Sequence, residues 1–327
     1  MSTATQAQSP PPQRVTRLAP SPTGALHLGN ARTFLVNWAL ARNHGWRIVL
    51  RIEDLDTPRV KAGAVGGIER TLRALGIDWD EGPLVQSRDL EPYRAAMTTL
   101  ASRGLTYPSP ETRGELEHVG DAASAPQEGG RESVFPATRR PGEIPTRFEP
   151  RAEPCNWRLV VPPREIIVRD HVAGERAFRP CDSVGDFVIW TKRDLPAYQL
   201  AVVVDDARQG VTDIVRGDDL LESAARQQLL IEGLALPHAP SYYHLPLVRG
   251  EDGKRLAKRH GDTRVDSYLE LGVRPERIIG LLAAWSGVPG GPREMSAEEF
   301  RSAFDLASLP RYDVVFRPGD DAWLRQA

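Results

Sequence analysis

A chain of 327 residues is long enough for two or three compact units, and its 40% hydrophobic content is sufficient for a substantial core. Its formal net charge of −2 excludes nucleic-acid binding through bulk positive charge, so any RNA contact requires a local basic surface. The two cysteines, Cys155 and Cys181, exclude a disulfide scaffold, suit small buried residues and favour a cytoplasmic protein. The sequence has no apolar run long enough for a membrane span, and residues 1–14 are interpreted as a disordered tail.

The first part of the chain predicts alternating strands and helices. Residues 15–19 and 47–52 are strand candidates, and residues 28–43 between them have apolar side chains at helical spacing. A further helix is predicted over residues 90–103. Strand, helix and strand in this order are typical of a βαβ unit in a parallel sheet.

The pattern changes in the middle of the chain and returns later. Residues 117–150 are rich in small and charged residues, which indicates a poorly packed insertion. The run Leu-Ala-Val-Val-Val over residues 200–204 predicts a buried strand, and residues 209–234 predict a strand, a turn and a helix. Apolar residues 278–285 and amphipathic residues 296–304 predict a small helical domain near the C-terminus.

The start of the first predicted helix has the most specific local pattern. A turn containing Gly24 precedes His27, Gly29 and Asn30 at the helix start. A helix N-terminus presents backbone N–H groups and a positive dipole end, which suits a triphosphate. Gly29 permits close approach of a purine or phosphate, and His27 can donate to phosphate oxygens. Taken alone, the two residues also suit a helix cap and a packing glycine; the complete preceding loop favours phosphate binding.

Several segments carry a family resemblance in the same order along the chain. Residues 17–30, RLAPSPTGALHLGN, resemble the first signature of class I aminoacyl-tRNA synthetases in its glutamyl form. Residues 51–59, RIEDLDTPR, are similar to the next block of that family, and residues 250–262, which contain RLAKRHG, resemble its second signature. Residues 197–221 and 244–248 are similar to the glutamyl-queuosine branch of the family.

This resemblance implies an α/β fold built on a Rossmann-type parallel sheet. The catalytic domain is expected over residues 15–104 and 182–262, interrupted by an inserted connective or RNA-contacting domain over residues 105–181. Residues 263–327 are expected to form a small helical domain of the stem-contact type.

The resemblance also implies a glutamate-binding site. A guanidinium can bind a carboxylate through two parallel hydrogen bonds, and a carboxylate at a strand end can hold the substrate ammonium. The residues that match the family positions are Arg17, Ala19, Ser21, Glu53, Tyr198 and Arg216. Each of them alone also suits a surface charge or a core tyrosine, so the combined pattern carries the prediction.

The implied reaction is activation of L-glutamate by ATP and Mg²⁺ to glutamyl-adenylate and pyrophosphate, without tRNA. His27 and Lys258 are the expected catalytic residues, because both can stabilise the charge of the leaving pyrophosphate. The expected ATP-binding residues are His27, Gly29, Asn30, Arg255 and Lys258. Arg255 stands where the second signature usually has Lys, Ala257 where it usually has Ser, and Asn30 where the first signature usually has a second His.

The positions that hold zinc in many relatives contain unsuitable residues here. They are Ser109, Glu111, Phe135 and Arg139, whereas a closed zinc site requires thiolate or imidazole ligands. The sequence therefore predicts that no zinc is bound, and no protein metal ligand is assigned.

The resemblance implies that the acceptor is queuosine at the wobble position of tRNA(Asp), presented by the anticodon stem-loop. Residues 263–327 are too few for the large anticodon-binding region of glutamyl-tRNA synthetases. We expect a monomer that contacts RNA through some of the arginines 139, 140, 151, 164 and 169, which equally suit a solvated surface. Three alternatives stay open: a truncated glutamyl-tRNA synthetase paralogue with another RNA acceptor, an adenylating ligase with a non-RNA acceptor, and a non-catalytic RNA- or glutamate-binding paralogue.

Overall fold

The computed structural model describes residues 13–22, 26–56, 63–110, 134–149, 154–237, 240–254, 256 and 262–326. A seven-stranded sheet forms its centre, with the strand order β3-β2-β1-β9-β10-β6-β7. Neighbouring strands are parallel except for the antiparallel hairpin β6–β7 at one edge. The strands of this sheet are β1 (Val15–Leu18), β2 (Arg47–Ile52), β3 (Glu81–Val85), β6 (Ile166–Asp170), β7 (Gly174–Phe178), β9 (Asp213–Gly217) and β10 (Ser241–Leu245). This arrangement confirms the predicted Rossmann-type fold class.

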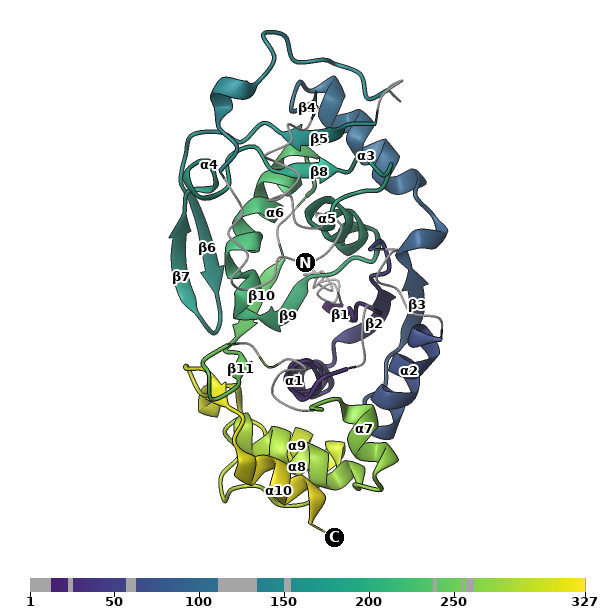
Figure 1. Cartoon of the computed structure of the whole chain (residues 1–327), viewed down its shortest axis with the longest axis vertical. Helices are drawn as coiled ribbons and strands as arrows, with labels where there is room; N and C mark the ends of the chain where they lie inside the picture. The colour runs from purple at the N-terminus through teal and green to yellow at the C-terminus, as the bar shows by residue number, and fades with distance from the viewer. Residues whose placement is uncertain are drawn as a thin grey trace, which may run out of the picture.

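Helices cover both faces of the sheet (Figure 1). Those of the sheet region are α1 (Leu28–His44), α2 (Ala64–Ala74), α3 (Glu91–Ser102), α4 (Pro180–Ser183), α5 (Tyr198–Arg208) and α6 (Leu221–Gly233). One face packs on α1, and the opposite face packs on α3, α5 and α6 in a separate buried cluster. The predicted helices over residues 28–43 and 90–103 and the predicted strand over residues 47–52 are confirmed.

The prediction of a strand over residues 200–204 is wrong, because these residues lie in helix α5. A short continuous apolar run suits a buried helix as well as a buried strand, and the pattern alone does not distinguish them. Nearly every side chain of α5 is buried, since α3 and α6 pack on it in addition to the sheet. The neighbouring prediction over residues 209–234 is confirmed by β9 and α6.

A second, three-stranded antiparallel sheet lies beside α3 and α5 at one end of the molecule (Figure 1). Its strands are β4 (Thr106–Ser109), β5 (Asn156–Leu159) and β8 (Val188–Trp190). Residues 134–140 lie against it through backbone bonds between Phe135 and the segment Val184–Asp186. Strands β6 and β7, from the segment expected as an insertion, extend the main sheet instead. The domain boundaries therefore remain predictions, and residues 111–133 lie outside the described part.

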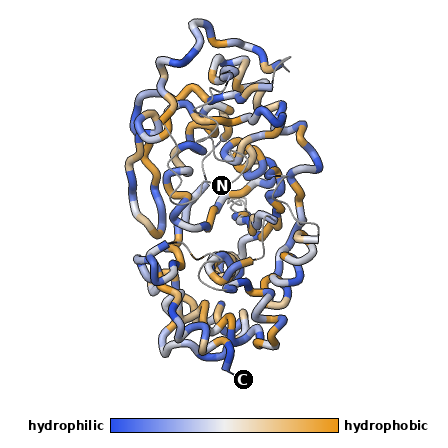
Figure 2. The backbone as a smooth tube through the Cα atoms, viewed as in Figure 1, coloured by the Kyte–Doolittle hydropathy of each residue, from blue (hydrophilic) through white to orange (hydrophobic). Residues whose placement is uncertain are grey.

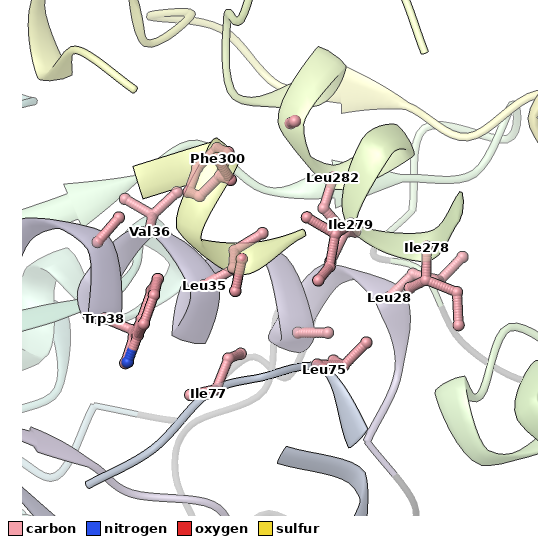
Figure 3. Packing of buried hydrophobic residues seen from close by; sticks show 14 of the residues in the cluster. Leu28, Leu35, Val36, Trp38, Leu75, Ile77, Ile278, Ile279, Leu282 and Phe300 are labelled. Atoms are coloured by element: carbon pink, nitrogen blue, oxygen red, sulfur yellow. The ribbon is translucent and has the colours of Figure 1, made fainter. Parts of the chain in front are cut away.

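The C-terminal residues form the predicted helical unit. Its helices are α7 (Val265–Glu270), α8 (Pro275–Trp285), α9 (Ala297–Ala303) and α10 (Pro318–Arg325). The short strand β11 (Val248–Arg249), which precedes α7, pairs in parallel with β12 (Val314–Val315), which precedes α10. Figure 2 shows hydrophobic and hydrophilic residues alternating along these helices, as one buried face requires. Side chains of α8 and α9 pack on α1, where Leu28, Leu35, Ile279 and Phe300 are buried (Figure 3). Helix α1 therefore links the C-terminal unit to the sheet.

None of the helices built from the described residues has the length and apolar character needed to cross a membrane.

Candidate active site

Three arginines project from neighbouring strands on one face of the main sheet. Arg17 is on β1, Arg51 on β2 and Arg216 on β9, and the exposed fraction of each residue is 5% or less. Arg17 pairs with Val49, and Arg216 pairs with His244 of β10, so the strand register places all of these side chains on the face that α5 covers. Because the strands are parallel, the arginines cluster toward one edge, where open α/β sheets bind ligands.

Two carboxylates hold Arg17 and Arg51 in an ion network, and Arg216 lies beside it. Asp206 of α5 accepts from Nη1 of Arg51 at 2.6 Å, and its Oδ1 lies 3.5 Å from Nε of Arg17. Glu53, the first residue after β2, accepts from Nε and Nη2 of Arg51 at 3.3 and 3.1 Å. Nη1 of Arg17 donates to the carbonyl oxygen of Val215 at 3.2 Å. The predicted residues Arg17 and Glu53 thus belong to one connected network.

Three guanidinium groups lie close together inside the protein. Arg17 is influenced by two anions, Asp206 and Glu53, and by two further cations, Arg51 and Arg216. Burial lowers the pKa of Arg17, against the opposing effect of Asp206. Burial raises the pKa of Glu53, against the opposing effects of Arg51 and Arg17. Among the described residues, Nη1 of Arg216 is buried without a hydrogen-bond partner, whereas Nε of Arg17 makes no hydrogen bond but faces Asp206 at 3.5 Å. An unpartnered buried guanidinium nitrogen is costly, and an anionic ligand would remove that cost.

The other predicted glutamate-site residues lie around this network. Tyr198 is the first residue of α5 and is 7% exposed. Burial raises the pKa of Tyr198 to about 12, with Glu53 as the next cause. Ala19 follows β1 directly, and Ser21 Oγ donates to the carbonyl oxygen of Glu53 at 3.1 Å. The structure therefore brings all six predicted residues to the ends of β1, β2 and β9 and the start of α5.

The predicted phosphate-binding end begins with His27 as the N-cap residue of α1. Nδ1 of His27 lies 3.2 Å from Oγ1 of Thr263, and Leu28 N donates to the Thr263 carbonyl oxygen at 3.0 Å. Gly29 lies in the first turn of α1 beside Val248, and Asn30 follows it on the exposed side. The first turn of a helix has N–H groups without intrahelical partners, so this end of α1 suits an anion.

Both flanks of the predicted second signature lie beside this helix start. Leu256 N donates to the carbonyl oxygen of Val248 at 3.1 Å, and Val265 N donates to that of Leu26 at 2.9 Å. Arg255, Lys258 and the rest of residues 257–261 lie outside the described part of the chain. These contacts bring the two predicted signature regions together. Their proximity was an expectation from the family resemblance alone.

Sequence reasoning assigned no role to four buried residues of this region. They are Arg51, Asp206, Tyr242 and His244, and all four are less than 8% exposed. Arg51 could have been found, because it stands two residues before Glu53 on the same strand face. The packing of α5 and β10 brings Asp206, Tyr242 and His244 to the site. Packing between distant elements has no local sequence pattern, so these three residues could not be predicted.

The described residues at the former zinc positions do not fit a zinc ion. The guanidinium carbon of Arg158 lies 3.8 Å from the ring centroid of Phe135, and its Nε donates to Ser109 Oγ at 3.3 Å. Arg139 also lies over the Phe135 ring, at 5.5 Å. A hydroxyl, a phenyl ring and two cations offer no zinc ligands. Glu111 lies outside the described residues.

The structure also bears on the cysteines and on the arginines expected to contact RNA. Cys155 and Cys181 are partly exposed, so the prediction that both are buried is wrong; neither forms a disulfide. Among the arginines proposed for RNA contact, Arg140 is held by Asp186, while Arg164 and Arg169 pair with Glu232 and Glu175 at the surface. Arg140 therefore has a structural contact, and Arg151 lies outside the described part.

A separate pocket of about 310 Å³ lies between the second-signature flank and α10. Its lining includes Gly250, Asp262, Thr263, Tyr268 and Arg325, and none of the predicted glutamate-site residues. The predicted glutamate-site residues therefore lie apart from this pocket.

Several known proteins are similar to this chain over most of its length. Residues 13–315 match the family model described as tRNA synthetases class I (E and Q), catalytic domain. A glutamyl-Q tRNA(Asp) synthetase of Symbiobacterium thermophilum is 43% identical over 91% of this chain and 94% of its own length. A protein of the same name from Rhodopirellula baltica is 45% identical over 92% of this chain and 93% of its own length.

Larger relatives match over only part of their length. Glutamate–tRNA ligase 2 of Parvibaculum lavamentivorans is 37% identical over 92% of this chain, which spans 60% of that protein. The crystal structure of a glutamate tRNA ligase from Elizabethkingia meningosepticum in complex with its amino acid superposes with a TM-score of 0.78, at 27% identity. That match covers 95% of this chain and 68% of the other. The chain is therefore a ligase that belongs to the class I glutamyl and glutaminyl tRNA synthetase family, within its glutamyl-Q tRNA(Asp) synthetase group.

Proposed function

We propose that the enzyme activates L-glutamate with ATP and transfers it to queuosine in the anticodon of tRNA(Asp). The observation that carries glutamate binding is the buried network of Arg17, Arg51 and Arg216 against Glu53 and Asp206. The three guanidinium groups lie together inside the protein, where an anionic substrate can bind to them. The Nη1 group of Arg216, which is buried without a hydrogen-bond partner among the described residues, provides a donor for a substrate carboxylate.

In this proposal, each glutamate group has its own contacts. The Glu53 carboxylate holds the substrate ammonium, and Arg17, Arg216 and the Tyr198 hydroxyl contact the carboxylates. Ser21 and the backbone of Ala19 form the near wall, since both adjoin Glu53 and Arg17. Aspartate and glutamine are expected to be poor substrates, because each misplaces a group that the site must pair.

ATP is proposed to bind at the start of α1 with His27, Gly29, Asn30, Arg255 and Lys258. An oxygen of the glutamate α-carboxylate attacks the α-phosphorus, and the bond to the pyrophosphate oxygen breaks. His27 and Lys258 stabilise the leaving charge, and Mg²⁺ accompanying ATP would neutralise part of it. The contact between His27 and Thr263 supports this arrangement, because it joins the helix start to the second-signature flank.

The acceptor step is proposed from the relatives of equal length, whose name specifies tRNA(Asp). A hydroxyl of the queuosine cyclopentenediol attacks the glutamyl carbonyl carbon, and AMP leaves. The single anticodon stem-loop is proposed to be sufficient as the RNA partner. Unpaired loop bases are accessible for stacking and edge recognition.

Two assays test these steps separately. Glutamate-dependent ATP–pyrophosphate exchange without tRNA tests activation, and its absence in folded protein would contradict it. Transfer of labelled glutamate to a queuosine-containing stem-loop of tRNA(Asp) tests the acceptor, with the guanosine-containing loop as the control. Glutamate found on the terminal adenosine of tRNA(Glu) would replace this acceptor with that of an ordinary glutamyl-tRNA synthetase.

A further inference from the structure

A buried chain of side chains behind Arg216 has no role in the proposed function. His244 of β10 lies opposite Arg216 in the strand register, and both residues are nearly inaccessible. Nε of Arg216 donates to Nε2 of His244 at 2.9 Å, and Nδ1 of His244 lies 2.6 Å from Oδ2 of Asp170. Three residues from β9, β10 and β6 are thus connected in line.

The contacts assign the protonation state of the imidazole. An arginine Nε–H can only donate, so Nε2 of His244 carries no proton. Nδ1 must therefore carry the proton and donate to Asp170. Burial lowers the pKa of His244 to about 4, with the hydrogen bond to Asp170 opposing this change. His244 is neutral near pH 7, in a single tautomer.

Asp170 is fixed independently of His244 side-chain contacts. Its Oδ1 accepts from the backbone N–H groups of Val172 at 2.8 Å and Ala173 at 2.6 Å. Its Oδ2 accepts from the His244 backbone N–H at 3.0 Å. Backbone groups of the β6–β7 turn and of β10 therefore anchor this carboxylate, and the imidazole transmits that anchor to Arg216.

The hydrogen bonds of Arg216 leave one edge of its guanidinium available. Nε is taken by His244, and Nη2 donates to the carbonyl oxygen of Leu220 at 3.2 Å. Nη1 is buried and lacks a hydrogen-bond partner in the described part of the chain. A carboxylate binds a guanidinium in its plane, so a plane fixed on one side sets the direction of the open edge.

We propose that Asp170 and His244 are positioning residues that hold the Arg216 guanidinium with its Nη1 edge toward the side-chain carboxylate of glutamate. The inference rests on the proposed function, since it takes Arg216 as a glutamate contact. A fixed cationic donor favours a carboxylate over the neutral amide of glutamine, because only the carboxylate gives a hydrogen bond in which both partners are charged. Asp170 and His244 therefore contribute to selectivity for glutamate as well as to affinity for it.

Two substitutions at His244 separate its two hydrogen bonds. H244N keeps a donor where Nδ1 meets Asp170 and removes the acceptor for Arg216. H244Q places its carbonyl oxygen near the Nε2 position and keeps that acceptor. We expect H244N to raise the glutamate KM about 10- to 100-fold, the range for loss of a charge-assisted hydrogen bond, with the ATP KM and kcat within about twofold. H244Q should recover most of the loss.

The control is Tyr243→Phe on the same strand. Tyr243 faces the other side of the sheet, and its hydroxyl accepts from Arg14 at 3.2 Å, so the variant tests general damage to β10. It should leave the glutamate KM unchanged. The preference for glutamate over glutamine, measured as a ratio of kcat/KM values, should fall in H244N and stay unchanged in Tyr243→Phe.

Calorimetric titration of glutamate onto each folded variant distinguishes the possible failures. If the wild-type protein binds no glutamate, the proposed function and the inference both fail. If the wild type binds glutamate and H244N binds it equally well, only the positioning role fails. Equal losses of glutamate and ATP binding in H244N and H244Q would assign His244 to structure alone and overturn the inference.

Discussion

Nη2 of Arg51 lies 3.1 Å from Oε1 of Glu53, although the two residues are only two positions apart at the end of β2. The two side chains form an ion pair inside the protein, where Arg51 is fully buried and Glu53 is mostly buried. Burial lowers the pKa of Arg51, but Asp206 and Glu53 outweigh it and the net pKa is raised. Arg51 therefore stays charged and holds both carboxylates in place.

Glu53→Gln should weaken glutamate binding without weakening the fold. Burial raises the pKa of Glu53 above its unfolded value, so the charged form costs stability once the pH exceeds that unfolded value. We expect an unfolding midpoint equal to or above the wild type at pH 7 and a glutamate KM raised about 10- to 100-fold. Glu81→Gln on β3 is the matched control, because Glu81 forms a surface ion pair with Arg47 of β2. This variant should change neither value.

Gly29→Ala should separate ATP binding from stability. A methyl group at Gly29 would meet Val248 at 3.5 Å, an ordinary contact, and alanine favours a helix by up to about 1 kcal/mol over glycine. The unfolding midpoint should therefore hold or rise, while the ATP KM rises if nucleotide approaches this backbone. Gly67→Ala in α2, where a methyl group meets only an arginine tip at 3.9 Å, is the control. An unchanged ATP KM in Gly29→Ala would refute the close approach.

Lys258→Ala should slow glutamate activation about 100-fold and leave the glutamate KM nearly unchanged. The proposed role places its ammonium on the leaving pyrophosphate, and one such charge-stabilising contact is worth roughly 3 kcal/mol. Pyrophosphate exchange measures both quantities. Lys254→Ala, an exposed lysine four positions earlier, should behave as the wild type. A raised glutamate KM with an unchanged rate would move Lys258 to the amino-acid site.

Local patterns predicted the regular elements better than the irregular ones. The strand over residues 47–52 has the predicted bounds, since it alternates and lies between clear boundaries. Helix α2 was not predicted, because Gly66 and Gly67 weaken its helical pattern, and β3 was not predicted, because Pro83 interrupts a short edge strand. Residues 200–204 were assigned to the wrong element because burial on all sides removes the periodicity.

The site was predicted where chemistry lies in contiguous motifs. Arg17, Glu53 and Arg216 come from three such motifs, and the structure brings them together, although their ligand roles remain predictions. The supporting contacts could not be predicted, because they join distant residues. Asp170 and His244 are 74 positions apart, and Arg51 and Asp206 are 155 apart. Only the packing of α5 and the strand order of the sheet create these pairs.

The buried His244 should make stability depend on pH. Its pKa falls from 6.5 to about 4 on folding, so the unfolded chain binds more protons in this window and stability falls as the pH drops from about 6.5 toward 4. At about 1.4 kcal/mol per unit, the loss is about 3 kcal/mol. Denaturant unfolding at several pH values should show a smaller loss in H244N, which lacks the imidazole. Parallel pH profiles of the two proteins would contradict a neutral buried His244.

Asp186 lies at the centre of the contacts around Phe135, one of the four positions considered for zinc in the sequence analysis. It is 1% exposed and accepts from the Tyr107 hydroxyl at 2.6 Å, from Nε and Nη2 of Arg140 at 2.7 Å each, and from the Val161 N–H at 2.9 Å. Its backbone N–H donates to the Phe135 carbonyl oxygen. This carboxylate therefore fastens residues 134–140 to the three-stranded sheet through hydrogen bonds and an ion pair.

Asp186→Asn should thus lower the free energy of unfolding by about 3 kcal/mol, because it leaves Arg140 without its counter-charge and turns an amide donor toward other donors. Asp182→Asn, at an exposed pair with Arg179, should leave the free energy of unfolding nearly unchanged, because solvent screens that pair. Chelator should alter neither the unfolding midpoint nor glutamate activation of the wild type, and metal analysis should find no stoichiometric zinc. Zinc at one equivalent, with a chelator-sensitive midpoint, would instead require ligands beyond the described residues. A wild-type-like Asp186→Asn would then show that the carboxylate does not hold this region together.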